Sequence, residues 1–441
     1  MFQNLPLSSN TSPMKSIAMV SLGCPKNLVD SEYICERLMG AGYTLVSDPE
    51  HAESVVVNTC AFLTSAVEES IETMLRYIDE GKKVICAGCI VSRYGNELLA
   101  ELPEVQLFAG PGTYGDLPGA LESGTKYLSG CFSEVVRRSY STTGSHAYVK
   151  VSEGCSNHCS YCLIPSIRGE LVSKHHQEVI DECKALADRG VREIILVAQD
   201  LGSFGTDNDD SLSLSKLVEK ISLLNDIAWI RLMYMHPATT TEAIVRTIAE
   251  NPKVVPYIDL PIQHISQQVL YAMGRKGGSD AVWKALDLLK SQAEHIWIRS
   301  TIMVGHPGED NKAFEELEGF IRQGYIDHLG VFTYSSEEGT KSAKMPNVLS
   351  QKLKDERREG IMALQQDVSR KRLKSLVGKS IHVLVEGFHP ETDLLLKGRS
   401  EFQAPEVDGV VIINEGHASF GTFSRVEITD TMEYDLLGRI V

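Results

Sequence analysis

The sequence lacks long hydrophobic runs, and no apolar stretch approaches the roughly 18 residues that a membrane-spanning helix requires. The first residues, MFQNLPLSSNTSP, also lack the basic and apolar segments of a secretion signal, so residues 1–13 are expected to form a short disordered tail. Hydrophobic residues still make up 43% of the chain, which is enough for buried cores. We therefore expect a cytoplasmic globular protein with no membrane partner.

The chain also has fewer basic than acidic residues. The chain has 43 Lys and Arg residues against 59 Asp and Glu, which gives a formal net charge of −16 at pH 7. Charge of this sign repels a phosphate backbone, so nucleic-acid binding would require a local basic patch. The overall charge suits a basic partner better.

The order of strand-like and helix-like runs predicts three folded domains. Residues 14–125 alternate short Val/Ile-rich runs with longer amphipathic ones, which predicts a parallel α/β domain, and residues 126–140 are a predicted linker. The β/α rhythm returns over residues 141–371, as in a full or partial TIM-like barrel, where functional residues lie at the carboxyl ends of strands. Residues 374–441 contain short strands broken by Gly, Pro and Asp, which predicts a small antiparallel β-barrel.

Ten cysteines in a cytosolic chain are better explained as metal ligands or buried thiols than as disulfides. Cys155, Cys159 and Cys162 form a C-x3-C-x2-C run directly after the first strand of the predicted barrel. Three thiolates on one loop can hold one side of a 4Fe–4S cluster and leave one iron open to a small molecule. The alternative is a structural zinc site completed by His158 or by a distant cysteine.

This cysteine run, with Tyr161 before its last cysteine, resembles the radical S-adenosylmethionine superfamily. The resemblance implies that the open iron binds the amino and carboxylate groups of S-adenosylmethionine, whose reductive cleavage yields a 5′-deoxyadenosyl radical. Tyr161, Gln199 and Arg299 are then candidate cofactor-binding residues, because Tyr161 lies in the loop and the other two lie in or after predicted barrel strands.

Three more cysteines lie far upstream, each just after an apolar strand: Cys24, Cys60 and Cys89. Brought together at one edge of a parallel sheet, they would form a second three-thiolate site. The alternative is that they are buried cysteines of the kind common at strand ends. The remaining cysteines are interpreted as packing residues, Cys86 because it would face the core of a strand, and Cys35, Cys131 and Cys183 because nothing around them resembles a ligand set.

The cysteine-bearing N-terminal block, the C-x3-C-x2-C loop and the C-terminal barrel together resemble the methylthiotransferases over nearly the whole chain. Other matching stretches are IPSIRGELVSK, VAQDLGSFG, LPIQH, VGHPGED and FTYSSEEGTKSAKM. The resemblance implies an auxiliary-cluster domain, a radical S-adenosylmethionine domain and a TRAM domain. It also implies two 4Fe–4S clusters, the second held by Cys24, Cys60 and Cys89 and carrying the sulfur to be inserted.

The stretch SLGCPKNLVDSE resembles the branch that modifies a ribosomal protein, the RimO branch, more than the branch that modifies a tRNA adenosine. In agreement, residues 377–441 contain five Lys or Arg and eleven Asp or Glu, the reverse of an RNA-binding footprint. The charged helical stretch before this barrel contains basic residues, which favour contact with RNA instead. The RimO resemblance implies that the substrate is an aspartate of small-subunit ribosomal protein S-twelve, converted to 3-methylthioaspartate.

Two alternatives remain at this stage. One is a methylthiotransferase that acts on a tRNA adenosine, and the other is a non-catalytic iron–sulfur protein that carries electrons or binds the ribosome. Against the electron carrier, both predicted sites are one thiolate short of full ligation. The enzyme interpretation also requires a sulfur donor and an electron donor such as flavodoxin or ferredoxin.

Overall fold

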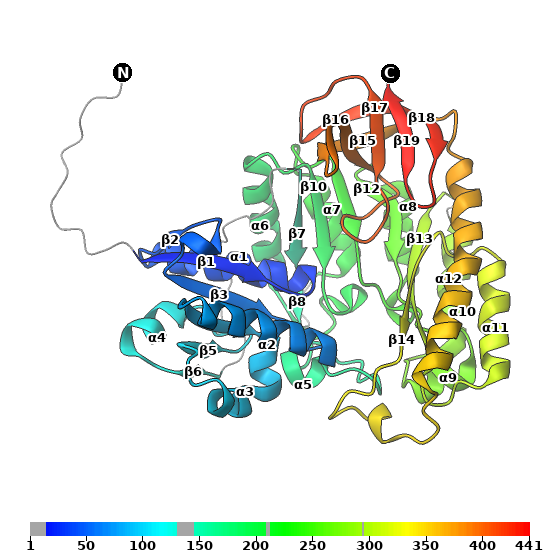
Figure 1. Ribbon diagram of the computed structural model, residues 1–441. Helices are drawn as coiled ribbons and strands as arrows, with labels where there is room; N and C mark the ends of the chain where they lie inside the picture. Colours follow the sequence, from blue (N-terminus) through cyan, green and yellow to red (C-terminus); the bar gives the residue numbers. More distant parts are fainter. Residues whose placement is uncertain (1–14, 130–144, 209–211, 293–294) are drawn as a thin grey trace, which may run out of the picture. The chain divides into compact units, whose positions relative to one another are not determined.

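The structure, a computed structural model, consists of two compact units (Figure 1). The first comprises residues 1–141 together with 166–168, and the second comprises residues 142–165 and 169–441. The residues that the structure describes are 15–129, 145–208, 212–292 and 295–441. The predicted N-terminal tail, most of the predicted linker and Cys131 therefore lie outside the described residues. Within the described ranges, no helix combines the length and apolar character needed to cross a membrane.

The first unit contains one parallel sheet of six strands in the order β2-β1-β3-β4-β5-β6. The strands are β1 (Ser16–Ser21), β2 (Thr44–Leu45), β3 (Ser54–Thr59), β4 (Lys83–Gly88), β5 (Leu107–Ala109) and β6 (Tyr127–Leu128). The helices are α1 (Pro25–Gly40), α2 (Thr64–Asp79), α3 (Cys89–Glu101) and α4 (Leu117–Ser123). Ile17, Val56 and Ile85 of the central strands form a buried core with Ile34 and Leu38 of α1. The predicted parallel α/β domain is confirmed, and its sheet extends through β6 into the first residues of the predicted linker.

The second unit begins with six parallel strands in the order β14-β13-β12-β11-β10-β7, which form an open sheet and thus a partial barrel. The strands are β7 (His146–Lys150), β10 (Glu193–Val197), β11 (Trp229–Leu232), β12 (Val254–Asp259), β13 (Trp297–Val304) and β14 (His328–Thr333). A two-stranded ribbon of β8 (Ser152–Glu153) and β9 (Val172–Ser173) follows β7. The helices are α5 (Ile164–Arg168, whose last three residues belong to the first unit), α6 (His176–Asp188), α7 (Leu214–Ser222), α8 (Glu242–Glu250), α9 (Gln267–Ala272), α10 (Gly278–Gln292), α11 (Asn311–Arg322) and α12 (Gln351–Lys374). Of the predicted full or partial barrel, the structure has the partial form.

The chain ends in a closed barrel of five strands in the order β15-β16-β17-β19-β18. These are β15 (Ser380–His389), β16 (Thr392–Ser400), β17 (Val411–Glu415), β18 (Thr422–Thr431) and β19 (Leu436–Ile440). The predicted small β-barrel is confirmed, although β17 and β19 pair in parallel. The long helix α12 leads into this barrel and packs along β14, the edge strand of the parallel sheet (Figure 1).

Buried ion pairs hold the C-terminal barrel against the parallel sheet. Glu193, the first residue of β10, accepts hydrogen bonds from Arg231 of β11 at 2.7 Å and from Arg399 of β16 at 2.6 Å. Arg399 also lies 2.8 Å from Glu386 of β15. Charges this deeply buried require partners on every side, because desolvation costs several kcal/mol per ion. The network therefore fixes one orientation of the C-terminal barrel on the sheet.

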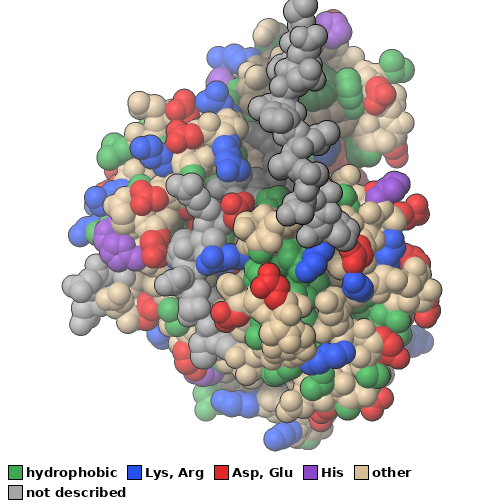
Figure 2. All heavy atoms as spheres, turned by 90° about the vertical axis from the view of Figure 1, so that its left-hand side faces the viewer, with side chains coloured by type: hydrophobic (Ala, Val, Ile, Leu, Met, Phe, Trp, Pro, Cys, Tyr) green, Lys and Arg blue, Asp and Glu red, His purple; other side chains and the backbone are tan. Residues whose placement is uncertain are grey.

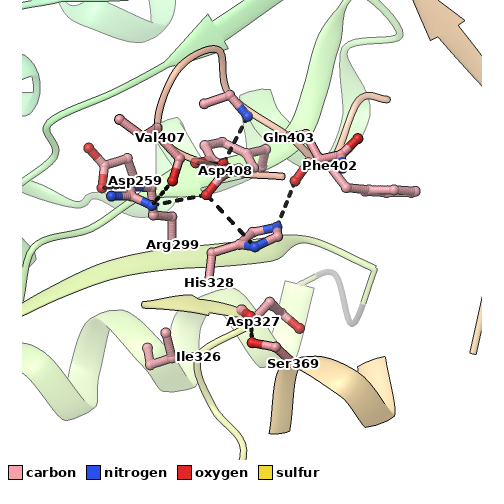
Figure 3. A network of polar contacts seen from close by, with 12 residues as sticks. Asp259, Arg299, Ile326, Asp327, His328, Ser369, Phe402, Gln403, Val407 and Asp408 are labelled. Carbon is pink, nitrogen blue, oxygen red and sulfur yellow. Dashed lines mark hydrogen bonds and ion pairs between the residues drawn. The ribbon is translucent and has the colours of Figure 1, made fainter. Parts of the chain in front are cut away.

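A second polar network centres on Asp408, in the loop between β16 and β17 (Figure 3). Its carboxylate accepts hydrogen bonds from Arg299 of β13 at 2.9 Å and from the hydroxyl of Tyr257 at 2.7 Å. His328, the first residue of β14, turns toward Asp408 and lies 2.9 Å from the carbonyl oxygen of Phe402 (Figure 3). Both networks engage the amino-terminal parts of the parallel strands, so the C-terminal barrel occupies that end of the sheet.

Two of the three tryptophans of the chain lie at this contact. Trp229 and Trp297 are the first residues of β11 and β13, and their rings lie 4.6 Å from Phe423 and 4.8 Å from Phe402, respectively. Tryptophan fluorescence should therefore report whether the C-terminal barrel is docked.

We expect Asp408→Asn to lower the free energy of unfolding by about 3–5 kcal/mol, because it leaves the buried guanidinium of Arg299 without its closest carboxylate. The measurement is a denaturant titration followed by tryptophan fluorescence. The control is Glu427→Gln, which removes a half-exposed ion pair with Arg439 and should cost no more than about 1 kcal/mol. Equal losses in the two variants would contradict the structural role of Asp408.

The ion pair network also predicts a pH dependence. Burial alone would raise the pKa of Glu193, but Arg399 and Arg231 outweigh it and lower the pKa from 4.5 to about 2. A carboxyl group with a lowered folded-state pKa stabilises the fold above its unfolded value, and this contribution is lost as the pH falls through the folded value. Glu193 therefore stabilises the protein fully above pH 4.5 and progressively less toward pH 2.

We expect the stability difference between wild type and Glu193→Gln to be constant near neutral pH and to shrink as the pH falls below 4.5. Denaturant midpoints of both proteins, measured across pH 3–7 by tryptophan fluorescence, test this. A difference that stays constant over the whole range would show that Glu193 does not act through its charge.

Candidate functional site

The three upstream cysteines lie at the carboxyl ends of three adjacent strands of the first unit. Cys24 follows β1 and directly precedes α1, Cys60 follows β3, and Cys89 is the first residue of α3 after β4. Burial first, and then negative charge on Cys24, raise the pKa of the Cys60 thiol. Burial raises the pKa of Cys89 to about 11, with smaller contributions of the same sign from Cys60 and Cys24 and an opposing one from Arg168. The structure thus places the three cysteines after neighbouring strands of one sheet.

Two glycines allow the strand ends to approach this closely. Gly23 has a φ of +89°, and a Cβ atom at this position would lie 2.8 Å from the Cβ of Cys60. Gly88 has a φ of +97°, and a Cβ there would lie 2.3 Å from the side-chain oxygen of Asn58. Any other residue would strain the backbone and push apart the loops that carry the cysteines.

Asn27, at the start of α1, binds the ends of two strands together. Its amide nitrogen donates to the carbonyl oxygens of Leu22 and Thr59, each at 2.8 Å. The amide nitrogen of Asn58 in turn donates to the carbonyl oxygen of Asn27 at 2.8 Å and to the hydroxyl of Ser31 at 2.8 Å. These bonds fix the loops after β1 and β3 in one arrangement.

A buried arginine contacts the same site. The Nε of Arg168 donates to the Sγ of Cys89 at 3.3 Å, and its Nη2 donates to Asn27 at 2.7 Å and to Asp30 at 3.0 Å. Arg168 belongs to the first unit by its contacts, although it follows Cys162 by only six positions in the chain. It lies in the quoted stretch IPSIRGELVSK, but nothing in the sequence pattern indicated a contact with Cys89.

The second group of cysteines lies on the loop after β7 in the second unit. Gly154, with a φ of +68°, passes so close to the returning chain that a Cβ atom would lie 2.0 Å from the carbonyl oxygen of Glu170. The amide of Cys155 donates to the carbonyl oxygen of Gly169 at 3.1 Å, and the amide of Cys162 donates to that of Cys159 at 3.1 Å. The loop is thus closed at its base and folded back on itself, with its three thiols on one short segment.

Each sulfur of this loop accepts a hydrogen bond. Asn157 donates to Cys155 at 3.5 Å, the amide of Ile164 donates to Cys162 at 3.4 Å, and Arg275 donates to Cys159 at 3.8 Å. Hydrogen bonds to cysteine sulfur stabilise the thiolate and tune a bound iron–sulfur cluster.

The electrostatics of the loop are dominated by burial. Burial raises the pKa of Cys155, and it raises the pKa of Cys162 to about 12, with further contributions from negative charge on Cys159 and Cys155. Negative charge on one thiol of the loop therefore opposes ionisation of its neighbours.

Two anchors hold the loop against the parallel sheet. Asp200, just after β10, accepts hydrogen bonds from Asn157, Ser203 and Thr239, at 2.8, 2.8 and 2.9 Å. The amide of Ser160 donates to the carbonyl oxygen of Met273 at 2.8 Å. Asp200 and Asn157 were not among the residues selected from the sequence, since a polar pair of this kind has no spacing signal.

The three predicted cofactor-binding residues lie in different places. The ring of Tyr161, in the cysteine loop itself, meets that of His306 edge-on at 6.1 Å. Gln199 is half-buried beyond the carboxyl end of β10, next to Asp200. Arg299 instead lies in the amino-terminal part of β13, where it contacts Asp408, and the structure does not bring it together with the cysteine loop.

The donor set of each group fits an iron–sulfur cluster through its chemistry. Each group supplies three thiol sulfurs, and in each at least one sulfur accepts a hydrogen bond from a buried or half-buried side chain. No group of three or more His, Cys, Asp and Glu side chains in the described part of the chain is arranged as a shell for a single metal ion. The candidate zinc ligand His158 is exposed and lies 3.2 Å from Glu170. The other described cysteines, Cys35, Cys86 and Cys183, are buried, as expected for packing residues.

Comparisons with known proteins assign each part of the chain. Residues 16–110 match the uncharacterized protein family UPF0004, residues 149–321 match the radical SAM superfamily, and residues 377–441 match the TRAM domain. Among curated proteins, the chain is 41% identical to the ribosomal protein uS12 methylthiotransferase RimO of Geobacter sulfurreducens, over 97% of this chain and 99% of that protein. It is also 41% identical to the RimO of Aquifex aeolicus, over 96% of each chain.

Solved structures show the same fold at low sequence identity. The radical S-adenosylmethionine methyltransferase TsrM from Kitasatospora setae aligns with a TM-score of 0.54 at 15% identity, covering 73% of this chain and 75% of that one. The cobalamin-dependent S-adenosylmethionine radical enzyme OxsB aligns with a TM-score of 0.51 at 12% identity, covering 80% of this chain and 56% of that one. The predicted fold class is confirmed by these matches together with the observed sheet and barrel.

We expect Gly23→Ala to reduce the iron that the chain binds, because the added Cβ would collide with Cys60 and a side chain at the positive φ of Gly23 strains the backbone. Iron content after anaerobic reconstitution measures the effect. The matched control is Gly42→Ala, which also has a positive φ, +88°, but open space around the added atom. If both variants keep the wild-type iron content, the close approach of Gly23 to Cys60 is not needed for binding.

Proposed function

We propose a function for this chain from its family, since it belongs to the RimO family of ribosomal protein uS12 methylthiotransferases. The chain attaches a methylthio group to the β-carbon of an aspartate in uS12, the S-twelve protein, and the product is 3-methylthioaspartate. The observation that carries the proposal is the 41% identity to a RimO protein over nearly the full length of both chains. The match extends through all three domains and is therefore not a likeness of the radical S-adenosylmethionine domain alone.

The C-x3-C-x2-C loop is the proposed site of radical generation. Membership of the radical SAM superfamily implies S-adenosylmethionine and a 4Fe–4S cluster, and Cys155, Cys159 and Cys162 would hold that cluster with one iron open to the cofactor. When bound, this pair supplies a radical able to abstract hydrogen from an unactivated carbon. Tyr161 and Gln199 are proposed cofactor contacts, since both lie on or beside the loop.

Protein groups around the loop position the cluster ligands and shield them. Asn157 donates hydrogen bonds both to the sulfur of Cys155 and to the carboxylate of Asp200. The position of this sulfur is therefore fixed relative to the end of β10. Arg275 donates to Cys159 and also to the carbonyl oxygen of Pro261 at 2.6 Å, which fixes its guanidinium. We leave Arg299 out of the proposed cofactor site, because its guanidinium is engaged by Asp408.

Cys24, Cys60 and Cys89 are the proposed ligands of a second 4Fe–4S cluster, whose open iron would carry the sulfur to be transferred. Support comes from their position at three adjacent strand ends and from the hydrogen bond of Arg168 to Cys89. A fourth ligand position is again left to a small molecule. The function then also requires a sulfur donor and an electron donor such as flavodoxin or ferredoxin.

The charge distribution favours the protein substrate over tRNA. The exposed acidic residues of the C-terminal barrel are Glu391, Asp393, Glu406, Glu415, Asp430 and Glu433, and its exposed basic residues are Lys379, Arg425 and Arg439. On the face of the molecule shown in Figure 2, Lys and Arg side chains of the described residues are interspersed with Asp and Glu and form no continuous basic patch. A basic ribosomal protein complements such a surface, whereas a phosphate backbone does not. We accordingly place the reaction in the cytoplasm, on uS12 or the small ribosomal subunit.

Mass spectrometry of cells lacking the gene tests the proposal against its alternatives. We expect the methylthio group of uS12 to disappear while tRNA nucleosides stay unchanged, and complementation with the intact gene should restore it. Loss from a tRNA adenosine instead would establish the tRNA alternative. If both modifications persist, the chain is not the methylthiotransferase for either substrate, and the non-catalytic iron–sulfur alternative gains support.

The two cysteine groups should fail in different ways. We expect Cys159→Ala to abolish reductive cleavage of S-adenosylmethionine, and Cys60→Ala to retain cleavage but to stop sulfur insertion, because each replacement removes a ligand from one proposed cluster only. Chromatography of 5′-deoxyadenosine and mass spectrometry of a uS12 peptide measure the two activities. Equal loss of cleavage in both variants would contradict the division of roles, and Cys183→Ala, at a buried cysteine outside both sites, is the control.

A further inference from the structure

Arg168 makes its contacts in a fully enclosed environment. Its side chain is 1% exposed, and that of Asp30, with which it pairs at 3.0 Å, is 0% exposed. The Nη2 atom binds both Asp30 and Asn27, while the Nε atom points to the Sγ of Cys89 at 3.3 Å. Asn27 and Asp30 therefore hold the guanidinium plane from one side and orient its Nε toward the sulfur.

The charge of this arginine is permanent. A guanidinium remains protonated at any pH a folded protein experiences, and in a buried site its field is weakly screened. A positive group that donates to a ligand sulfur stabilises negative charge on the cluster and so favours its reduced form. Asp30 acts in the opposite direction, since its carboxylate neutralises part of the charge of Arg168.

The origin of Arg168 in the chain adds a second observation. It is the last residue of α5 and follows the C-x3-C-x2-C loop, yet residues 166–168 belong by their contacts to the first unit. The segment that continues from one cysteine group thus supplies a cation to the other.

We propose that Arg168 is a positioning residue for the site of Cys24, Cys60 and Cys89, which orients the Cys89 sulfur through Nε and raises the reduction potential of the cluster bound there. The inference rests on the second cluster of the proposed function. It assigns Arg168 an electrostatic role beyond its ion pair with Asp30. The balance of charge between Arg168 and Asp30 would then help to set the reduction potential of the cluster.

The test uses the full-length chain with Cys155, Cys159 and Cys162 all replaced by alanine, so that only the first-unit cluster contributes. Iron and sulfide content, the electron paramagnetic resonance spectrum of the reduced cluster and its midpoint potential in a dye-mediated titration are measured in this parent. Arg168→Gln, Arg168→Lys and Asp30→Asn are then introduced singly. Arg76→Gln, at an exposed position on α2, controls for loss of a positive charge elsewhere in the first unit.

We expect Arg168→Gln to shift the midpoint potential to more negative values and to change the spectrum, because both the charge and the Nε donor are lost. Arg168→Lys keeps the charge and should lie between parent and Arg168→Gln. Asp30→Asn should shift the potential in the positive direction, because it removes the neutralising carboxylate and keeps the cation. If the pair had only a structural role, replacing Arg168 and replacing Asp30 would not shift the midpoint potential in opposite directions.

The outcomes separate the inference from the proposed function. A parent protein without iron would overturn the second cluster itself. A parent with iron whose potential and spectrum are unchanged by Arg168→Gln would overturn the role of Arg168 alone. If Arg168→Gln loses its cluster, Arg168→Lys and Asp30→Asn provide the test instead. Midpoint potentials that shift in the same direction in these two variants, or in neither, would overturn the inference.

Discussion

Parallel strands deliver their carboxyl ends to the same edge of a sheet, and the chemistry of this protein depends on that constraint. In the first unit it gathers three cysteines that are far apart in the sequence, because β1, β3 and β4 are neighbours in the sheet. In the second unit it places the cysteine loop after β7 beside Asp200, which follows the adjacent strand β10. In the first unit, sheet topology alone thus brings cysteines that no local motif connects to the ends of neighbouring strands.

The opposite ends of the strands in the second unit serve a structural purpose. Glu193 and His328 are the first residues of β10 and β14, and both face the C-terminal barrel rather than a ligand. Because Glu193 and His328 find their partners in this barrel, the C-terminal barrel is attached without using the carboxyl ends of the strands. Arg299 is an example: it lies in the amino-terminal part of β13, so its partner is Asp408 of the C-terminal barrel.

Much of the architecture could be predicted from the sequence, and the reasons are local. The Val/Ile-rich runs that form β1, β3 and β4 directly precede the cysteines, so the sequence alone predicts that Cys24, Cys60 and Cys89 lie at one edge of the sheet. Arg168, Asn157 and Arg275 could not be found in this way, because their contacts with cysteine sulfurs depend on the three-dimensional path of loops that have no periodic pattern. The contact of Arg299 with Asp408 could not be predicted for a related reason, since a position within a strand does not reveal which end of the sheet a long side chain reaches.

The buried charge network at the amino-terminal end of the sheet also bears on how the chain is made. During synthesis N-terminal segments emerge first, so Glu193 and Arg231, which pair with each other, leave the ribosome before Arg399, the barrel residue that also binds Glu193. Until then we expect this end of the partial barrel to stay hydrated, because burying the carboxylate of Glu193 without Arg399 would be costly. Docking of the C-terminal barrel brings Arg399 to Glu193 and turns these groups into part of the interior, so we expect this docking to be a late step of folding.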